Sequence, residues 1–500
     1  IIYLAAMGIG LGALVTSRFT ITHDDGLGAL ELARDLDLRH PSTWYNGFYP
    51  VGHTLFCRVL MSVDPFTLPA LANLVFTLAE LAFAAALLRT PGQPVWLGAL
   101  AAGVAYSFPS FFYYATQPGP DPGCTAFLLG GAWFLWSAAR AEEPRLVWRR
   151  ALTAGALLGL AALWRHHALP FAAGLIPGFA FVGRRNPRLF VAASAGAALV
   201  YSLQIFVNLS AGHGPFATHA GFLAHQYMYG VDWPEVGGPG DFHGSLLDVF
   251  ALSRAHFITS WNKVFSSHLP VLVWFFAAAW KGGGADFPRK STALLAGVAP
   301  YLLLASLGSS DRAILPVVPL LAVVVAGLVF NTPPASPAMR RPLGALFAAA
   351  LLAGLLASWT MNTGYGQWRR KLAGHYAEMG RALAAAGAGD ARRVRTNGFS
   401  LYSPALPGFR PGFHGGRHKC DTGSRNGILP DPALPWPEYR ARLEAAGVKA
   451  VALSGRFRIV HNDLAALFHE DRPLPGLEPA GVFEYFKVYR LTPMNPAHAP

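Results

Sequence analysis

Two adjacent carboxylates, Asp24 and Asp25, are the residues of this chain best placed for chemistry. They stand where a segment with helical apolar spacing begins, at Leu27, Leu30 and Leu36. A carboxylate can take a proton from a nucleophile as a general base, and an acidic pair can hold a divalent cation. Acids at a helix start also interact favourably with its unpaired amide groups. The pair therefore predicts either a site of chemistry or a charged helix start.

Charged side chains recur at the predicted ends of other apolar segments. Asp121 opens one segment, Arg165 and His166 follow another, and Arg312 precedes a third. Fixed cations at a membrane surface could stabilise negative charge that develops on a leaving group such as a phosphate. The alternatives are that the arginines reach to lipid headgroups and that Asp121 caps its helix. Together with the acidic pair, Asp121 could also supply oxygen ligands to Mg²⁺ or Mn²⁺.

Several of the apolar segments that must position these residues are near the length that crosses a bilayer, and the shorter ones gain length from their flanks. The chain has 500 residues, of which 53% are hydrophobic and 13% charged, with a mean hydropathy of +0.34. A water-soluble protein of this size would struggle to hide that much apolar surface. A helix needs roughly 20 apolar residues to span the hydrocarbon. Residues 1–15 are predicted to be a span that has lost its start, and the other apolar runs are 151–163, 170–182, 189–207, 271–280, 292–307, 313–330 and 343–359.

Basic residues predict which ends of the spans face the cytoplasm. The net charge of +13 is spread over short connections and the C-terminal region, which argues against a nucleic-acid partner. Short loops rich in Arg and Lys stay cytoplasmic, and here they lie at 89, 140–150, 184–188, 281–290 and 340–341. The alternate connections are then extracytoplasmic: the first outer loop 16–50, 113–121, 165–167, the long outer loop 210–263, 308–312 and everything after 359.

This alternation gives about eleven spans. The number of spans agrees with this alternation only if residues 51–61, which follow Pro50, do not cross the membrane. They are therefore predicted to form an interfacial or re-entrant helix, and residues 65–88 to form the second span. After residue 361 the composition changes, with helices predicted at 368–386, 437–446 and 463–469 and strands at 448–453 and 482–491. The predicted fold is mainly α: a polytopic transmembrane helical bundle at 1–360 and a small extracytoplasmic α/β domain at 361–500.

Short motifs spread over nearly the whole chain resemble one family of membrane proteins. They are the Asp24–Asp25 pair with Ala33, Arg34 and Leu36 behind it, the turn Asn46-Gly47-Phe48-Tyr49-Pro50 followed by His53, Gly119-Pro120-Asp121-Pro122, residues 155–165, and Asp311-Arg312-Ala313-Ile314-Leu315-Pro316. Together these motifs resemble the GT-C glycosyltransferase superfamily. The most similar branches are family 39 and the RgtA/B/C/D-like members, related to protein O-mannosyltransferases and aminoarabinose transferases.

The resemblance implies a glycosyltransferase that moves a hexosyl or pentosyl group from a polyprenyl-phosphate donor to an acceptor hydroxyl on the extracytoplasmic face. Asp24 matches the family's general base, and Asp25 stands where the family often has Glu, as a helper. The residues implied in substrate or donor binding are Asn46, Tyr49, His53, Asp121, Arg165, His166 and Arg312. No cofactor is implied with certainty, although some relatives need a divalent cation, Mg or Mn, which Asp24 and Asp25 would hold.

The implied partners are membrane lipids, the lipid-linked sugar and a glycan, lipid or protein acceptor, in the bacterial inner (cytoplasmic) membrane. A transporter or lipid flippase is the alternative, and such proteins carry ionisable groups near the membrane midplane. Glu80 is the one clear acid well inside a predicted span. A non-catalytic assembly or carbohydrate-binding protein is the third alternative.

Overall fold

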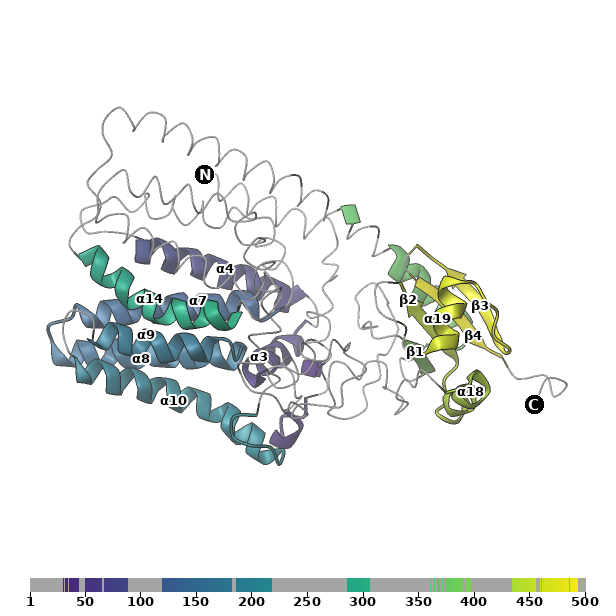
Figure 1. Ribbon diagram of the computed structural model, residues 1–500, viewed down its shortest axis with the longest axis horizontal. Coiled ribbons are helices and arrows are strands. Elements are labelled where there is room, and N and C mark those ends of the chain that lie inside the picture. The colour runs from purple at the N-terminus through teal and green to yellow at the C-terminus, as the bar shows by residue number, and fades with distance from the viewer. Residues whose placement is uncertain are drawn as a thin grey trace.

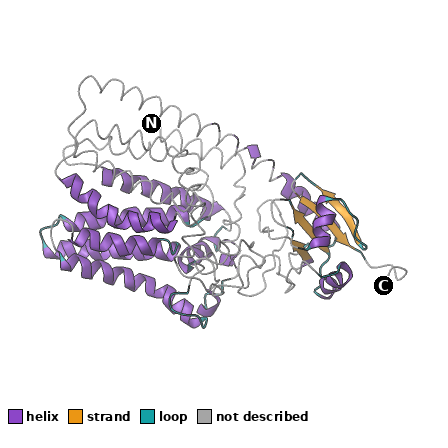
Figure 2. Ribbon diagram, in the orientation of Figure 1, coloured by secondary structure: helices purple, strands orange, loops and turns teal. Residues whose placement is uncertain are grey.

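A computed structural model describes two parts of the chain, a helical bundle and a mixed α/β unit (Figure 1). The described residues are 30, 32–34, 36–44, 50–64, 67–88, 119–181, 186–217, 286–305, 360, 364, 367–368, 371, 374–389, 393–396, 434–455, 459, 461–484 and 486–492. The predicted fold class is confirmed: apolar helices dominate, and the strands lie together near the C-terminus (Figure 2).

Six long helices of the described part lie side by side (Figure 1): α4 (Thr67–Leu88), α7 (Asp121–Ala139), α8 (Pro144–Trp164), α9 (Ala168–Phe181), α10 (Pro187–Ser210) and α14 (Asp286–Ala305). Three of the described ranges, 68–87, 144–164 and 187–210, are long and apolar enough to cross a membrane by length and composition. Large apolar side chains such as Val75, Leu152 and Leu199 stay exposed on α4, α8 and α10, as lipid-facing positions would. The total of about eleven spans stays a prediction.

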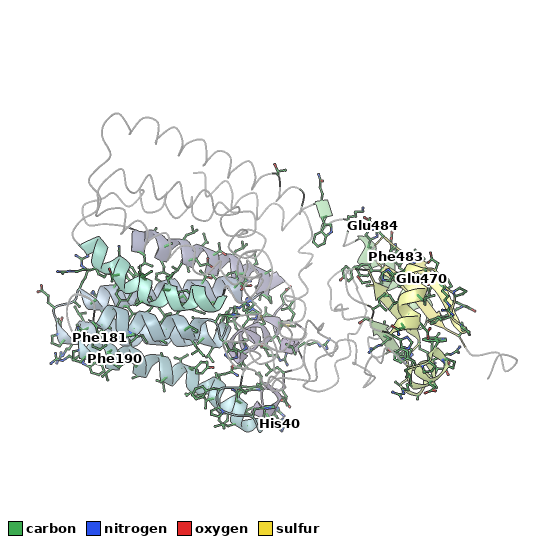
Figure 3. All side chains as sticks on the ribbon, viewed as in Figure 1. His40, Phe181, Phe190, Glu470, Phe483 and Glu484 are labelled. Atoms are coloured by element: carbon green, nitrogen blue, oxygen red, sulfur yellow. The ribbon has the colours of Figure 1, made fainter. Side chains whose placement is uncertain are left out.

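Contacts between the helices show that successive helices run in opposite directions through the bundle. This is the alternation that the basic loops predicted. At one end, Lys290 donates to the carbonyl oxygen of Leu87, and Arg150 donates to that of Ser137. The rings of Phe181 and Phe190 also meet there, with centroids 5.6 Å apart, and Figure 3 shows both far from His40. This end gathers the basic residues Arg140, Arg145, Arg149, Arg150, Arg188, Arg289 and Lys290.

The opposite end carries two short helices, α3 (Val51–Met61) and the 3-10 helix η1 (Pro41–Trp44). Helix α3 covers the residues predicted as an interfacial or re-entrant helix. Its 11 residues extend for only about 16 Å, much less than a membrane span. Helix α4 corresponds to the predicted span 65–88, but it begins two residues later.

Glycines allow the backbones of neighbouring helices to approach closely. A Cβ atom at Gly155 of α8 would lie 1.9 Å from the carbonyl oxygen of Ala193 in α10. A Cβ at Gly174 of α9 would lie 2.1 Å from the carbonyl oxygen of Ala296 in α14. Such separations are far below van der Waals contact, so only glycine fits at these crossings.

We therefore expect Gly155→Ala to destabilise the bundle. Because the methyl group would meet backbone, the two helices must separate, at a cost of roughly 1–3 kcal/mol. Gly214→Ala is the matched control, since a Cβ there has no heavy atom within 4 Å. Thermal unfolding of the purified protein in detergent should give a lower midpoint for Gly155→Ala alone, and equal midpoints for both variants would contradict this packing.

The C-terminal unit is a four-stranded mixed sheet in the order β1-β2-β4-β3. The strands are β1 (Val394–Thr396), β2 (Ala450–Ser454), β3 (Leu477–Val482) and β4 (Phe486–Leu491), with β1 parallel to β2 and the other pairs antiparallel. Residues 374–385 are helical and bury apolar side chains against one face, where Ala450 and Ala452 lie. Helices α18 (Trp436–Ala445) and α19 (Asn462–His469) pack on the other face, with Val451 and Leu453.

Helices α18 and α19 and strand β2 confirm the predictions for 437–446, 463–469 and 448–453 within one or two residues. The strand predicted at 482–491 is confirmed only as β4, which begins four residues later, because Val482 belongs to β3. The chain turns between β3 and β4, where the backbone N–H of Phe483 donates to the carbonyl of Phe486. The run Val482-Phe483-Glu484-Tyr485-Phe486 contains no Gly, Pro, Asn or Asp, so the turn gives no sequence signal.

Candidate active site

An ion pair between Asp121 and Arg165 joins two helix ends at the end of the bundle that carries α3. Asp121 lies in the first turn of α7, and Arg165 ends α8 with an extended backbone. The guanidinium donates to the Asp121 carboxylate, and the two side chains are 17% and 6% exposed. Asn73 of α4 donates to the carbonyl of Gly119, 3.0 Å away, and so ties the preceding turn to the same place. Both side chains are largely shielded from water, which strengthens the attraction between their charges.

The indole of Trp164 occupies the centre of an aromatic cluster directly before Arg165. Its ring contacts Phe56 of α3, Phe76 of α4 and Phe127 of α7, with centroids 5.6, 6.1 and 5.0 Å away. A Cβ at Gly123 would lie 2.3 Å from the indole nitrogen, so the ring rests on the backbone of α7. This packing fixes the residue immediately before Arg165 and so limits where the guanidinium can reach.

Helix α3 brings His53 to the same cluster. The imidazole is buried, meets the edge of Trp164 at a centroid distance of 6.3 Å, and lies 3.5 Å from the Sγ of Cys57. A Cβ at Gly52 would lie 2.7 Å from the Cβ of Leu163. The first turn of α3 is therefore pressed against the end of α8.

The helical residues that follow the acidic pair in sequence pack on the other side of α3. Leu30 and Ala33 are fully buried in a small cluster with Cys57, against which Met61 packs. The side chain of Arg58 donates to the carbonyl oxygen of Leu36 across 3.3 Å. Helix α3 thus lies between the end of α8 and the segment that begins a few residues after Asp24 and Asp25.

His166 follows Arg165 in the short turn before α9. Its Nδ1 lies 3.3 Å from the hydroxyl of Tyr201 in α10. Burial lowers the pKa of His166 from 6.5 to about 4, because the imidazolium would lose its hydration there. His166 is therefore neutral near pH 7 and can offer a hydrogen bond to a substrate, but no positive charge.

This depressed pKa predicts that acid destabilises the protein through His166. Between the folded-state pKa of about 4 and the unfolded value of 6.5, the unfolded chain binds the extra proton, so stability falls as the pH falls through that window. From about pH 7.5 to about pH 5 the loss is about 2 kcal/mol. His166→Gln should show a smaller drop in unfolding midpoint over this range than the wild type, and identical pH profiles would rule out a buried neutral His166.

Glu80 of α4 is fully buried and belongs to the same region. Arg165, Asp121 and Glu80 all lie near Cys124 of α7. The acid noted inside a predicted span thus lies near the ion pair.

The structure brings together four of the predicted site residues: His53, Asp121, Arg165 and His166. Asp24, Asp25, Asn46, Tyr49 and Arg312 lie outside the described residues, so their predicted roles stay predictions. Trp164, Tyr201 and Gln204 were missed. Gln204 alone had a signal, as a polar residue inside the apolar run 189–207.

The described residues of this region hold no ready site for a divalent cation. One carboxylate oxygen of Asp121 already accepts from Arg165, and the ligand role predicted for Asp121 stays a prediction. In the described ranges there is no group of three or more His, Cys, Asp or Glu side chains that could hold a metal ion. The ligand role of Asp24 and Asp25 stays a prediction.

Solved structures resemble the chain over almost its full length. ArnT from Cupriavidus metallidurans bound to undecaprenyl phosphate matches with a TM-score of 0.62 at 13% identity, over 98% of this chain and 99% of that chain. The apo form of that protein gives 0.60 at 14% identity with the same coverage. The apo oligosaccharyltransferase of Archaeoglobus fulgidus gives 0.53 at 12% identity, over 96% of this chain and 74% of that chain. No family model and no curated protein matches the sequence.

These similarities establish the fold. The chain has the fold of the GT-C membrane glycosyltransferases, to which ArnT, an aminoarabinose transferase, and the archaeal oligosaccharyltransferase both belong. The GT-C resemblance of the sequence motifs is thereby confirmed at the level of the fold. Since a fold hosts different substrates, the activity has to be argued from the site.

Proposed function

We propose that this protein transfers a sugar from a polyprenyl-phosphate donor to an acceptor hydroxyl at the end of the bundle that carries α3. The observation that carries the proposal is the fold match to ArnT bound to undecaprenyl phosphate, over nearly all of both chains. The buried Asp121–Arg165 pair at one bundle end supports it, because it holds the N–H donors of Arg165 in place near the helix that carries His53. The acceptor is a glycan, a lipid or a protein.

In the proposed reaction Asp24 is the general base. It takes the proton of the acceptor hydroxyl while the hydroxyl oxygen bonds to the anomeric carbon. The bond between that carbon and the phosphate oxygen breaks, and its electron pair leaves with the lipid phosphate. Asp25 orients the acceptor or tunes the pKa of Asp24 by like-charge repulsion. As an alternative role, the two carboxylates would hold an Mg²⁺ or Mn²⁺ ion.

The leaving phosphate needs positive partners, and Arg165 and Arg312 are proposed for this role. Asp121 already neutralises the charge of Arg165, so Arg165 contributes directed N–H donors more than net charge. Asn46, Tyr49, His53 and the neutral His166 are proposed to bind the donor by hydrogen bonds and ring contacts. Fixed donors of this kind stabilise the charge that develops in the transition state.

The proposed site faces the extracytoplasmic side. Seven basic residues gather at the opposite end of the described helices, and such residues stay in the cytoplasm. The α/β unit lies beyond the bundle end that carries α3 (Figure 1), which supports placing it on the same side of the membrane as the site. The bacterial inner membrane is the proposed location.

Binding of undecaprenyl phosphate to the purified protein tests the donor class. Undecaprenol, which has the same chain without the phosphate, is the matched control. If Arg165 and its neighbours bind the phosphate, undecaprenyl phosphate should bind at least about tenfold more tightly. Equal affinities, or no binding of either lipid, would contradict a polyprenyl-phosphate donor.

A further inference from the structure

Helix α3 begins without a capping side chain of its own. Its N-cap residue is Pro50, which forms no side-chain cap, and the next residue, Val51, is buried. A buried backbone N–H at a helix start needs a partner, because leaving it unpaired costs free energy. Gln204 of α10 supplies that partner: its Oε1 accepts from the Val51 N–H over 2.8 Å, across 153 residues of sequence.

The Gln204 side chain is the middle of a directional chain of hydrogen bonds. Its Nε2 donates to the Oδ1 of Asn208 at 2.8 Å, and the Nδ2 of Asn208 donates to the carbonyls of Pro215 and Ala217 at 3.0 and 3.2 Å. The groups at the two ends of this hydrogen-bond series fix the orientation of both amides. The Val51 N–H can only donate, and the carbonyls of Pro215 and Ala217 can only accept. Both amides are buried, at 2% and 0% exposure, so each bond is protected from water.

What Gln204 fixes is the helix on which the candidate site is assembled. Helix α3 carries His53 against Trp164, the residue before Arg165. Through Cys57 it also supports the segment at 30–36, which follows the acidic pair. The Gln204 bond is the hydrogen bond that the described residues supply to the start of this 11-residue helix, so its loss should let the first turn move against α8.

We propose that Gln204 is a positioning residue of the active site, which holds the N-terminus of α3 and thereby places His53 and the segment after the acidic pair. This inference deepens the proposed function and rests on it. Among the described residues, Gln204 bonds to Val51 and Asn208 and not to the ion pair. The same amide chain ties the turn at 215–217, where the long outer loop begins, to the start of α3.

The free thiol of Cys57 reports on the position of α3 without any assay of activity. Cys57 and Cys124 are both buried, at 2% and 1% exposure, and only Cys57 lies on α3. Modification by a maleimide, measured at each cysteine by mass spectrometry, should be at least about tenfold faster at Cys57 in Gln204→Leu than in the wild type, with Cys124 unchanged. Unchanged protection of Cys57, or equal exposure of both thiols, would overturn the inference.

Gln204→Glu is the conservative rescue. In its neutral form a Glu side chain offers a carbonyl to the Val51 N–H and an O–H to Asn208, so it reproduces both hydrogen bonds of the amide. Ser202→Ala is the control on the same helix, since the Ser202 hydroxyl is exposed and donates only to the carbonyl of Leu199. Both variants should keep Cys57 protected, and exposure of Cys57 in Gln204→Glu equal to that in Gln204→Leu would contradict the role of the amide.

Binding of undecaprenyl phosphate to the same variants tests whether the position of α3 affects the candidate site. Gln204→Leu should weaken binding about tenfold, while Gln204→Glu and Ser202→Ala should stay within about twofold of the wild type. Wild-type affinity in Gln204→Leu would overturn the link to the site. If the wild type binds no undecaprenyl phosphate, the proposed function fails, and the labelling of Cys57 still decides whether Gln204 positions α3.

Discussion

Asp24→Asn is expected to lower the rate of sugar transfer by a factor of about 10² to 10⁴, the usual contribution of a general base. The amide has nearly the same shape as the carboxylate but cannot take the proton of the acceptor hydroxyl. Binding of undecaprenyl phosphate should stay near the wild-type value, because the base acts on the acceptor. Turnover of a radiolabelled lipid-linked sugar measures the first quantity, and lipid binding measures the second.

Two further variants serve as comparisons for Asp24→Asn. Asp25→Asn should cause a smaller loss, since Asp25 is proposed as a helper. Glu470→Gln, on the surface of the C-terminal unit (Figure 3), should leave transfer unchanged. Full transfer activity in a folded, lipid-binding Asp24→Asn protein would show that Asp24 is not the base.

The second large effect is expected at Arg165. Arg165→Ala leaves the Asp121 carboxylate buried without its cation, which costs about 3–5 kcal/mol for a buried pair. The variant should therefore unfold at a markedly lower temperature and bind undecaprenyl phosphate poorly. Thermal unfolding in detergent and lipid binding measure the two losses.

A paired replacement separates these two losses. Asp121→Leu combined with Arg165→Met removes both charges together, and such apolar replacements of buried ion pairs are often neutral or stabilising. We expect the double variant to regain most of its stability while its binding of undecaprenyl phosphate stays weak. A double variant with restored stability and wild-type binding would show that Arg165 only joins α7 to α8.

The bundle was predictable because its signals are local. Apolar runs marked α9 and α10 to within three residues, whereas α8 and α14 begin seven and six residues before their runs. The shortness of 51–61 distinguished α3 from a span. Strand β1 was missed because three residues carry too little pattern. The hairpin between β3 and β4 was missed because an aromatic run continues through its turn.

The site was predictable only as a set of residues at helix ends. Asp121 and Arg165 both fell at predicted outer ends, but their pairing joins residues 44 positions apart and depends on the packing of α7 against α8. For Asp121, helix capping was one alternative from the sequence, and the structure adds a charge partner from the next helix. The neutral state of His166 could not be predicted, because it results from burial of the turn beside Tyr201.

The central claim is that a sugar leaves a polyprenyl-phosphate carrier and enters an acceptor, and one measurement tests it most directly. The protein is reconstituted in liposomes with a radiolabelled polyprenyl-phosphate sugar and a crude envelope acceptor fraction, and both the label on the acceptor and the donor's distribution between leaflets are followed. The account predicts labelled acceptor that appears with the wild type and fails to appear with Asp24→Asn. Movement of the intact donor across the membrane with no labelled acceptor would contradict it and would identify a transporter.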